Sequence, residues 1–365
     1  MITTHKFFFH NSNNMKELKD NSVNLIVTSP PYPMIEMWDD IMGKQNTAIS
    51  KAWIKQEPNK VFELMHQELD KVWKECFRVL AEGGFLCINI GDATRTVNGD
   101  FKLYNNHSRI AQYCNRIGFN EMPCILWRKE TNAPNKFMGS GMLPCGAYVT
   151  LEHEYILIFR KGSKRKFKTS EDKMKRMESA FFWEERNIWF SDIWNIKGCR
   201  QNMKDTATRN RSGAYPFEIP YRLINMFSEK EDTVLDPFMG LGTSMIAAML
   251  SNRNSVGFEI DRTLKEAISD RILNISIDKA NGLIKQRFDK HLQFVEDREI
   301  NQKKEVKHYN SLLKCKVMTK QEEFLTLDYL KSIKIKDALD FAFETEYLDE
   351  TNLRELPFIA KGSLF

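Results

Sequence analysis

A short motif in the first part of the chain could bind and orient an amine. Residues 28 to 32 read Thr-Ser-Pro-Pro-Tyr and follow the apolar run 23–27. Consecutive prolines have no N–H to donate and hold φ at about −65°, so a strand that runs into them must end. The carbonyls of Ser29 and Pro30 can then accept hydrogen bonds beside the flat ring of Tyr32, an arrangement that suits a planar ring with an exocyclic amino group. The candidate catalytic residues are Ser29, Pro30, Pro31 and Tyr32.

A second motif, residues 232–244, could bind a nucleoside. A β-rich run ends in Asp236, a Gly-x-Gly turn follows, and an apolar helical stretch begins near Ser244. Gly240 and Gly242 allow a tight turn and a close approach of the backbone to a ligand at the start of a helix. A nicotinamide-binding fingerprint would need a third small residue where Met245 stands, and no phosphate-loop lysine follows. The turn therefore predicts a site for a nucleoside without a pyrophosphate.

Together the two motifs resemble those of the amino-methylating DNA methyltransferases that use S-adenosylmethionine. The resemblance covers most of residues 5 to 275 and includes the segments 78–88, 153–159, 191–194 and 215–220. The catalytic motif precedes the cofactor motif, which is the order of the β group of that superfamily. Ser-Pro-Pro-Tyr resembles the N4-cytosine branch, whereas many N6-adenine enzymes carry Asp at the position of Ser29.

The resemblance implies direct transfer of a methyl group from S-adenosylmethionine to N4 of a cytosine flipped out of duplex DNA, with no metal. It also implies that host DNA is protected from a partner restriction endonuclease, without a stable complex between the two proteins. Asn11 departs from the family, which often has Asp there, and Glu259 is expected to bind the ribose hydroxyls. The expected cofactor-binding residues are Asn11, Thr28, Phe217, Pro220, Asp236, Phe238, Gly240, Gly242, Thr243 and Glu259.

Three alternatives remain open from the sequence. The first is N6-adenine transfer on the same scaffold. The second is a nicotinamide-dependent oxidoreductase, which lacks its third glycine here. The third is a DNA-binding protein that has lost catalysis. Phe217 and Pro220 could equally be ordinary core residues.

Basic and aromatic residues between the two motifs indicate nucleic-acid binding. Residues 160–176 hold nine Lys or Arg against two acids, and a second basic cluster follows after several aromatic residues. A solvated charged surface is the alternative for either cluster alone. The expected DNA-binding residues are Lys164, Arg165, Lys166, Lys168, Arg200, Arg209 and Arg211.

Length and pattern predict one large α/β domain with additions. The chain has 365 residues, 42% of them hydrophobic, and its seven cysteines show no Cys-x-x-Cys spacing, which favours reduced core cysteines over disulfides or a zinc site. It has no long apolar segment, so we expect a cytoplasmic protein without a membrane span. Alternating strands and helices predict a doubly wound, mostly parallel sheet, seven-stranded by resemblance to the Rossmann-like methyltransferase fold with permuted motif order.

Four regions follow from this interpretation. Residues 1–161 form the catalytic half of the core, and 162–212 form a target-recognition insert. Residues 213–284 form the S-adenosylmethionine-binding half, and 285–365 form a helical C-terminal extension of unassigned role. Residues 33–60 are expected to be a loop over the site.

Overall fold

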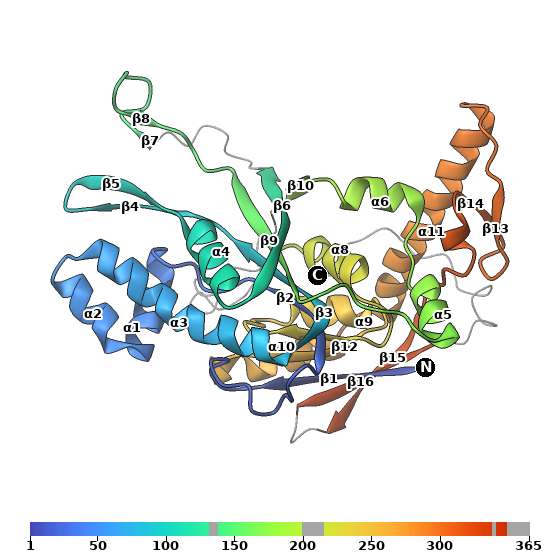
Figure 1. Ribbon diagram of the computed structural model, residues 1–365, viewed down its shortest axis with the longest axis horizontal. Coiled ribbons are helices and arrows are strands. Elements are labelled where there is room, and N and C mark those ends of the chain that lie inside the picture. The colour runs from blue at the N-terminus through green and yellow to red at the C-terminus, as the bar shows by residue number, and fades with distance from the viewer. Residues whose placement is uncertain (131–137, 199–214, 338–340, 349–365) are drawn as a thin grey trace.

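The computed structural model describes residues 1–130, 138–198, 215–337 and 341–348, which fold around one large sheet (Figure 1). The helices are η1 (Glu36–Trp38), α1 (Asp39–Gln45), α2 (Thr47–Ile54), α3 (Pro58–Val79), α4 (Asn106–Arg116), α5 (Ser170–Glu178), α6 (Trp183–Trp189), α8 (Glu218–Phe227), α9 (Thr243–Met249), η2 (Arg262–Leu264), α10 (Lys265–Leu273), α11 (Ile277–Ile300) and η3 (Lys320–Glu322). The strands are β1 (Ile2–Phe8), β2 (Val23–Thr28), β3 (Leu80–Ile90), β4 (Ala93–Val97), β5 (Asp100–Tyr104), β6 (Phe119–Glu130), β7 (Met138–Gly139), β8 (Ala147–Tyr148), β9 (His153–Lys161), β10 (Ile193–Lys197), β11 (Thr233–Asp236), β12 (Asn254–Phe258), β13 (His308–Asn310), β14 (Cys315–Val317), β15 (Leu330–Asp337) and β16 (Ala342–Tyr347).

The main sheet has ten strands in the order β10-β6-β9-β3-β2-β11-β12-β1-β16-β15. Parallel pairs join β3 to β2, β2 to β11, β11 to β12 and β12 to β1, while β9 runs antiparallel to both β3 and β6. The strands from β6 to β1 in this order are the seven that were expected, and β10, β16 and β15 extend the sheet at its two ends. The predicted α/β fold with a mostly parallel sheet is confirmed.

Helices cover both faces of the sheet, as the alternation of side chains along the strands requires. Along β9, Ile156 and Ile158 enter one apolar cluster with α8, α9, α10 and α11. Leu157 and Phe159 enter the other cluster, with α1, α2, α3 and α4. The sheet is thus the middle layer of three.

The parallel strands place several turns along one edge of the sheet. Strands β1, β2, β3, β11 and β12 all run the same way, so the turns that follow them lie along what we call the carboxyl edge. The opposite edge, where these strands begin, is the amino edge. Ligands in open α/β sheets bind at the carboxyl edge.

The C-terminal region differs from the expected helical extension. Helix α11 ends at Ile300, after which β13 and β14 pair, and β15 and β16 join the main sheet beside β1. In β16, Phe343, Thr345 and Tyr347 alternate with more exposed residues, and Phe343 stacks on Phe7 of β1. This period of two is a strand pattern, so the helical prediction is wrong for the described residues beyond 300.

Residues 33–60 are also not the expected loop. They form η1, α1, α2 and the start of α3, with Met42, Ile49 and Ala52 buried. Over the described ranges, the helices are too short or too polar to span a bilayer.

Candidate active site

A cavity of about 350 Å³ opens at the carboxyl edge, where the turns after β2 and β11 meet. Its lining brings the two predicted motifs together although more than two hundred residues separate them. The predicted residues that line it are Asn11, Ser29, Pro30, Pro31, Tyr32, Asp236, Phe238, Gly240, Thr243 and Glu259. This volume is in the range of cofactor and substrate pockets.

Four predicted cofactor residues do not line the cavity. Thr28 is buried and donates to Asp236, and Gly242, with φ of 77°, is the residue before α9. Phe217 packs against the core and stacks on Tyr221, while Pro220 is buried within α8. Phe217 and Pro220 therefore have the placement of core residues.

Asp236 joins the two motifs through its buried carboxylate. One carboxylate oxygen accepts hydrogen bonds from the Thr28 hydroxyl, at 2.6 Å, and from the Phe238 N–H, at 3.1 Å. The other accepts from the Ser244 hydroxyl at 2.6 Å. Burial raises the pKa of Asp236 to about 6, although all three donors favour the ionised form. The side chain therefore fixes the catalytic turn against the glycine turn.

Glu259 holds the glycine turn from the end of β12. Its carboxylate accepts hydrogen bonds from the N–H of Gly240 at 2.9 Å and from that of Asp261 at 2.8 Å, and burial raises its pKa. Gly240 has φ of 51°, and a Cβ there would meet no atom within 4 Å. Because Gly240 lines the cavity, a side chain at this position would occupy space that a ligand needs.

The catalytic turn is tied to two residues of other strands. The Tyr32 hydroxyl donates to Glu154 of β9 at 2.8 Å and accepts from the Asn89 amide of β3 at 2.8 Å. The Asn89 amide also donates to Glu154 at 2.7 Å, and Lys129 of β6 forms an ion pair with the same carboxylate. Burial and the negative charge of Glu154 raise the pKa of Tyr32 well above its ordinary value. Tyr32 is therefore a neutral, fixed ring at the cavity wall.

Several lining residues were missed as site residues from the sequence. Asn89, Lys129, Glu154, Tyr215 and Ser244 all line the cavity. Glu154 and Tyr215 fall inside segments that resemble the family, and that resemblance was their only signal. Nothing in the local sequence marks Asn89 or Lys129, which strand pairing brings to the site.

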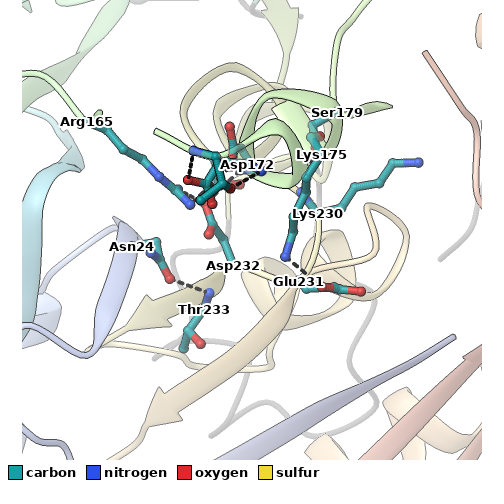
Figure 2. A network of polar contacts seen from close by, with 12 residues as sticks. Asn24, Arg165, Asp172, Lys175, Ser179, Lys230, Glu231, Asp232 and Thr233 are labelled. Carbon is teal, nitrogen blue, oxygen red and sulfur yellow. Dashed lines mark hydrogen bonds and ion pairs between the residues drawn. The ribbon is translucent and has the colours of Figure 1, made fainter. Parts of the chain in front are cut away.

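The first basic cluster lies at the amino edge, away from the cavity. Strand β9 has nine residues and runs from the carboxyl edge at its start to the amino edge at Lys161, a distance of about 26 Å at about 3.3 Å per residue. The exposed Lys164, Lys166 and Lys168 follow it. Figure 2 shows Arg165 beside Asp232, at the start of β11.

Acidic neighbours neutralise Arg165. Its guanidinium contacts Asp232 at 2.6 Å and Glu229 at 3.1 Å, so its charge is balanced within the protein. Lys164, Arg165, Lys166 and Lys168 and the cavity therefore lie at opposite edges of the sheet.

The second basic cluster lies outside the described residues. Arg200, Arg209 and Arg211 follow β10, which runs parallel to β6 and ends at Lys197 beside Glu130. The chain thus leaves β10 at the carboxyl edge and returns at Tyr215, which lines the cavity.

Comparison with known proteins identifies the class. A family model described as DNA methylase matches residues 23–270. The Type II methyltransferase M.MthZI of Methanothermobacter thermautotrophicus is 48% identical over 345 residues, which cover 94% of this chain and 95% of that protein. The Type II methyltransferase M.MjaI of Methanocaldococcus jannaschii is 50% identical over 283 residues, covering 74% and 92%. A putative DNA modification methylase of Thermus thermophilus, solved with S-adenosyl-L-methionine, superposes with a TM-score of 0.57 at 29% identity, covering 73% of this chain and 92% of that one.

The chain belongs to the N6/N4 DNA methylase family. It is an S-adenosylmethionine-dependent DNA methyltransferase of the restriction–modification type. The predicted enzyme class and cofactor are thereby confirmed, and the family includes both N4-cytosine and N6-adenine enzymes.

Proposed function

We propose that the chain methylates the exocyclic N4 of cytosine in duplex DNA. The assignment rests on Ser29, because this chain has a hydroxyl at the position where many N6-adenine enzymes have a carboxylate. A hydroxyl and a carbonyl provide sufficient hydrogen-bond acceptors for the cytosine amine. By analogy with its Type II relatives, the enzyme would protect host DNA from a restriction endonuclease that acts separately.

The residues present fit S-adenosylmethionine. The cavity joins a glycine turn with free space over Gly240 to the buried carboxylate of Asp236 and the half-buried carboxylate of Glu259. In the proposed site, Glu259 would accept hydrogen bonds from the ribose hydroxyls, while Asp236, Phe238 and Thr243 would surround the methionine end. Asn11, whose amide donates to Gln45 at 3.3 Å and which lines the cavity, would contact the adenosine. The bound cofactor supplies the activated methyl group.

The protein's part in the reaction is to position the target amine. The amine of cytosine is a weak nucleophile because its lone pair is delocalised into the ring. Hydrogen bonds to the Ser29 hydroxyl and the Pro30 carbonyl would localise that lone pair on nitrogen, and Tyr32 would support the flipped ring. Flipping costs a few kcal/mol, which contacts in the pocket offset. No residue needs to bond covalently to the base.

We also propose that DNA lies along the carboxyl edge and contacts Arg200, Arg209 and Arg211. The support is that β10 ends at this edge and that the chain returns at the cavity. Within the insert 162–212, this proposal assigns the reading of the DNA sequence to the part that follows β10.

N6-adenine methylation is the second candidate, since the cavity and both motifs would serve it equally. Sequencing that detects modified bases, applied to plasmid DNA from cells that express the chain, distinguishes the two. We expect modified cytosines within one short recurring sequence, and none in a plasmid that encodes Ser29→Ala. Modified adenines in that sequence would refute the base assignment and leave the enzyme class intact.

A further inference from the structure

The hydroxyl of Ser29 is part of a directed chain of hydrogen bonds that ends on Glu154. Its Oγ lies 3.2 Å from the Tyr32 hydroxyl oxygen, which in turn lies 2.8 Å from a carboxylate oxygen of Glu154. The Asn89 amide donates to the Tyr32 oxygen at 2.8 Å. All four side chains line the cavity.

The direction of the chain follows from counting donors. A carboxylate only accepts, so the single proton of the Tyr32 hydroxyl is directed to Glu154. Between the two hydroxyls, Ser29 must then be the donor. With its proton committed to Tyr32, the Ser29 oxygen keeps its lone pairs for other partners. The Asn89 amide nitrogen lies 3.4 Å from this oxygen, but its two protons are directed to Tyr32 and Glu154.

This arrangement leaves the Ser29 oxygen as an acceptor at the cavity wall. Left to itself, a serine hydroxyl can donate or accept, and a donating Ser29 would oppose the two N–H groups of an exocyclic amine. Hydrogen bonds in a chain also polarise one another, so the carboxylate at its end strengthens the acceptor at its start. Such contacts are often long before substrate binds and shorten in the complex.

We propose that Glu154 is a positioning residue for methyl transfer, which acts through Tyr32 to hold the Ser29 hydroxyl as an acceptor for the target amine. The chain Glu154–Tyr32–Ser29 gives a serine the acceptor character that a carboxylate would otherwise supply. This inference rests on the proposed catalytic role of Ser29. It assigns Glu154 a function that is separate from its ion pair with Lys129 and its contact with Asn89.

A double-mutant cycle tests the proposal. Single-turnover transfer of labelled methyl groups to DNA is measured for wild type, Glu154→Gln, Tyr32→Phe and the double variant, with S-adenosylmethionine affinity measured in parallel. Each single change should slow transfer about tenfold and leave cofactor affinity unchanged. Because the effect of Glu154 passes through the Tyr32 hydroxyl, the double variant should be about as slow as the slower single variant.

Glu185→Gln is the matched control. Glu185 is also buried and ion-paired, with Arg287, but lies outside the cavity lining, so its substitution should leave the transfer rate unchanged. Should Glu154→Gln not fold, a cycle of Tyr32→Phe with Ser29→Ala tests the link between Tyr32 and Ser29 through which Glu154 must act, and independent effects of these two changes would also overturn the proposal.

Three results would overturn the proposal: Tyr32→Phe as fast as wild type, Glu154→Gln as fast as wild type, or a double variant slowed by the product of the two single effects. The label is counted in total DNA, so label in adenine would refute the base assignment without affecting the cycle. Absence of label with wild type would refute the proposed function itself.

Discussion

Binding of S-adenosylmethionine should weaken below about pH 6, because Asp236 must be ionised to attract the sulfonium. Asp236 accepts a hydrogen bond from Thr28, the residue before Ser29. In the proposed mechanism its carboxylate therefore lies where the methyl group must meet the amine. Burial raises its pKa to about 6, so about one molecule in ten is ionised at pH 5. Two unit charges about 5 Å apart attract by about 3 kcal/mol at an effective dielectric constant of about 20, so the ionised form should bind about 100-fold more tightly.

Calorimetric titration between pH 5 and pH 8 measures this effect. The dissociation constant should be about tenfold higher at pH 5 than at pH 8, since only the ionised fraction binds well. S-Adenosylhomocysteine, which lacks the methyl group and the positive charge, is the control, because titration of Glu259 affects both ligands alike. The preference for S-adenosylmethionine over S-adenosylhomocysteine should therefore decrease as the pH is lowered, and Asp236→Asn should remove this pH dependence. An equal pH dependence for the two ligands in wild type would refute the placement of the sulfonium beside Asp236.

Three further outcomes are expected. Gly240→Asp should abolish cofactor binding in calorimetry, because the new side chain would enter the cavity. Circular dichroism should show an intact fold, and retained affinity would mean that the cofactor lies elsewhere. Neutralising Arg200, Arg209 and Arg211 should reduce the slope of log affinity for DNA against log salt by about 0.9 per lost phosphate contact. The matched triple change of Lys164, Lys166 and Lys168 should leave that slope unchanged, and a reduced slope there would place DNA at the amino edge. Ser29→Ala should lose most methyl transfer and keep cofactor affinity, whereas a loss of both would indicate a structural role.

The site residues that could be identified from the sequence are those that stand together in one short motif. Ser29 and Tyr32 stand in one motif with the prolines that end the strand, and Asp236 and Gly240 stand in one turn. Each motif specifies its own local backbone, and parallel strands then place both at one edge. Glu154 lacks such a signal, because its position beside Tyr32 depends on the antiparallel pairing of β9 with β3.

Topology also explains where the structure differs from the arrangement that the sequence suggested. Lys164 to Lys168 lie between the two motifs in sequence, but antiparallel β9 carries the chain to the opposite edge of the sheet. Sequence proximity could not show that. In the C-terminal region, frequent Lys and Glu suggested helix, although the alternation in β16 is decided by burial against β1.

Identification of the methylated nucleoside tests the central claim most directly. Duplex DNA is incubated with the purified chain and labelled S-adenosylmethionine, digested to nucleosides and analysed by mass spectrometry. We predict label in N4-methylcytosine with wild type and almost none with Ser29→Ala. Label in N6-methyladenine would overturn the base assignment, and label in 5-methylcytosine, or in no nucleoside, would contradict the proposed mechanism as a whole.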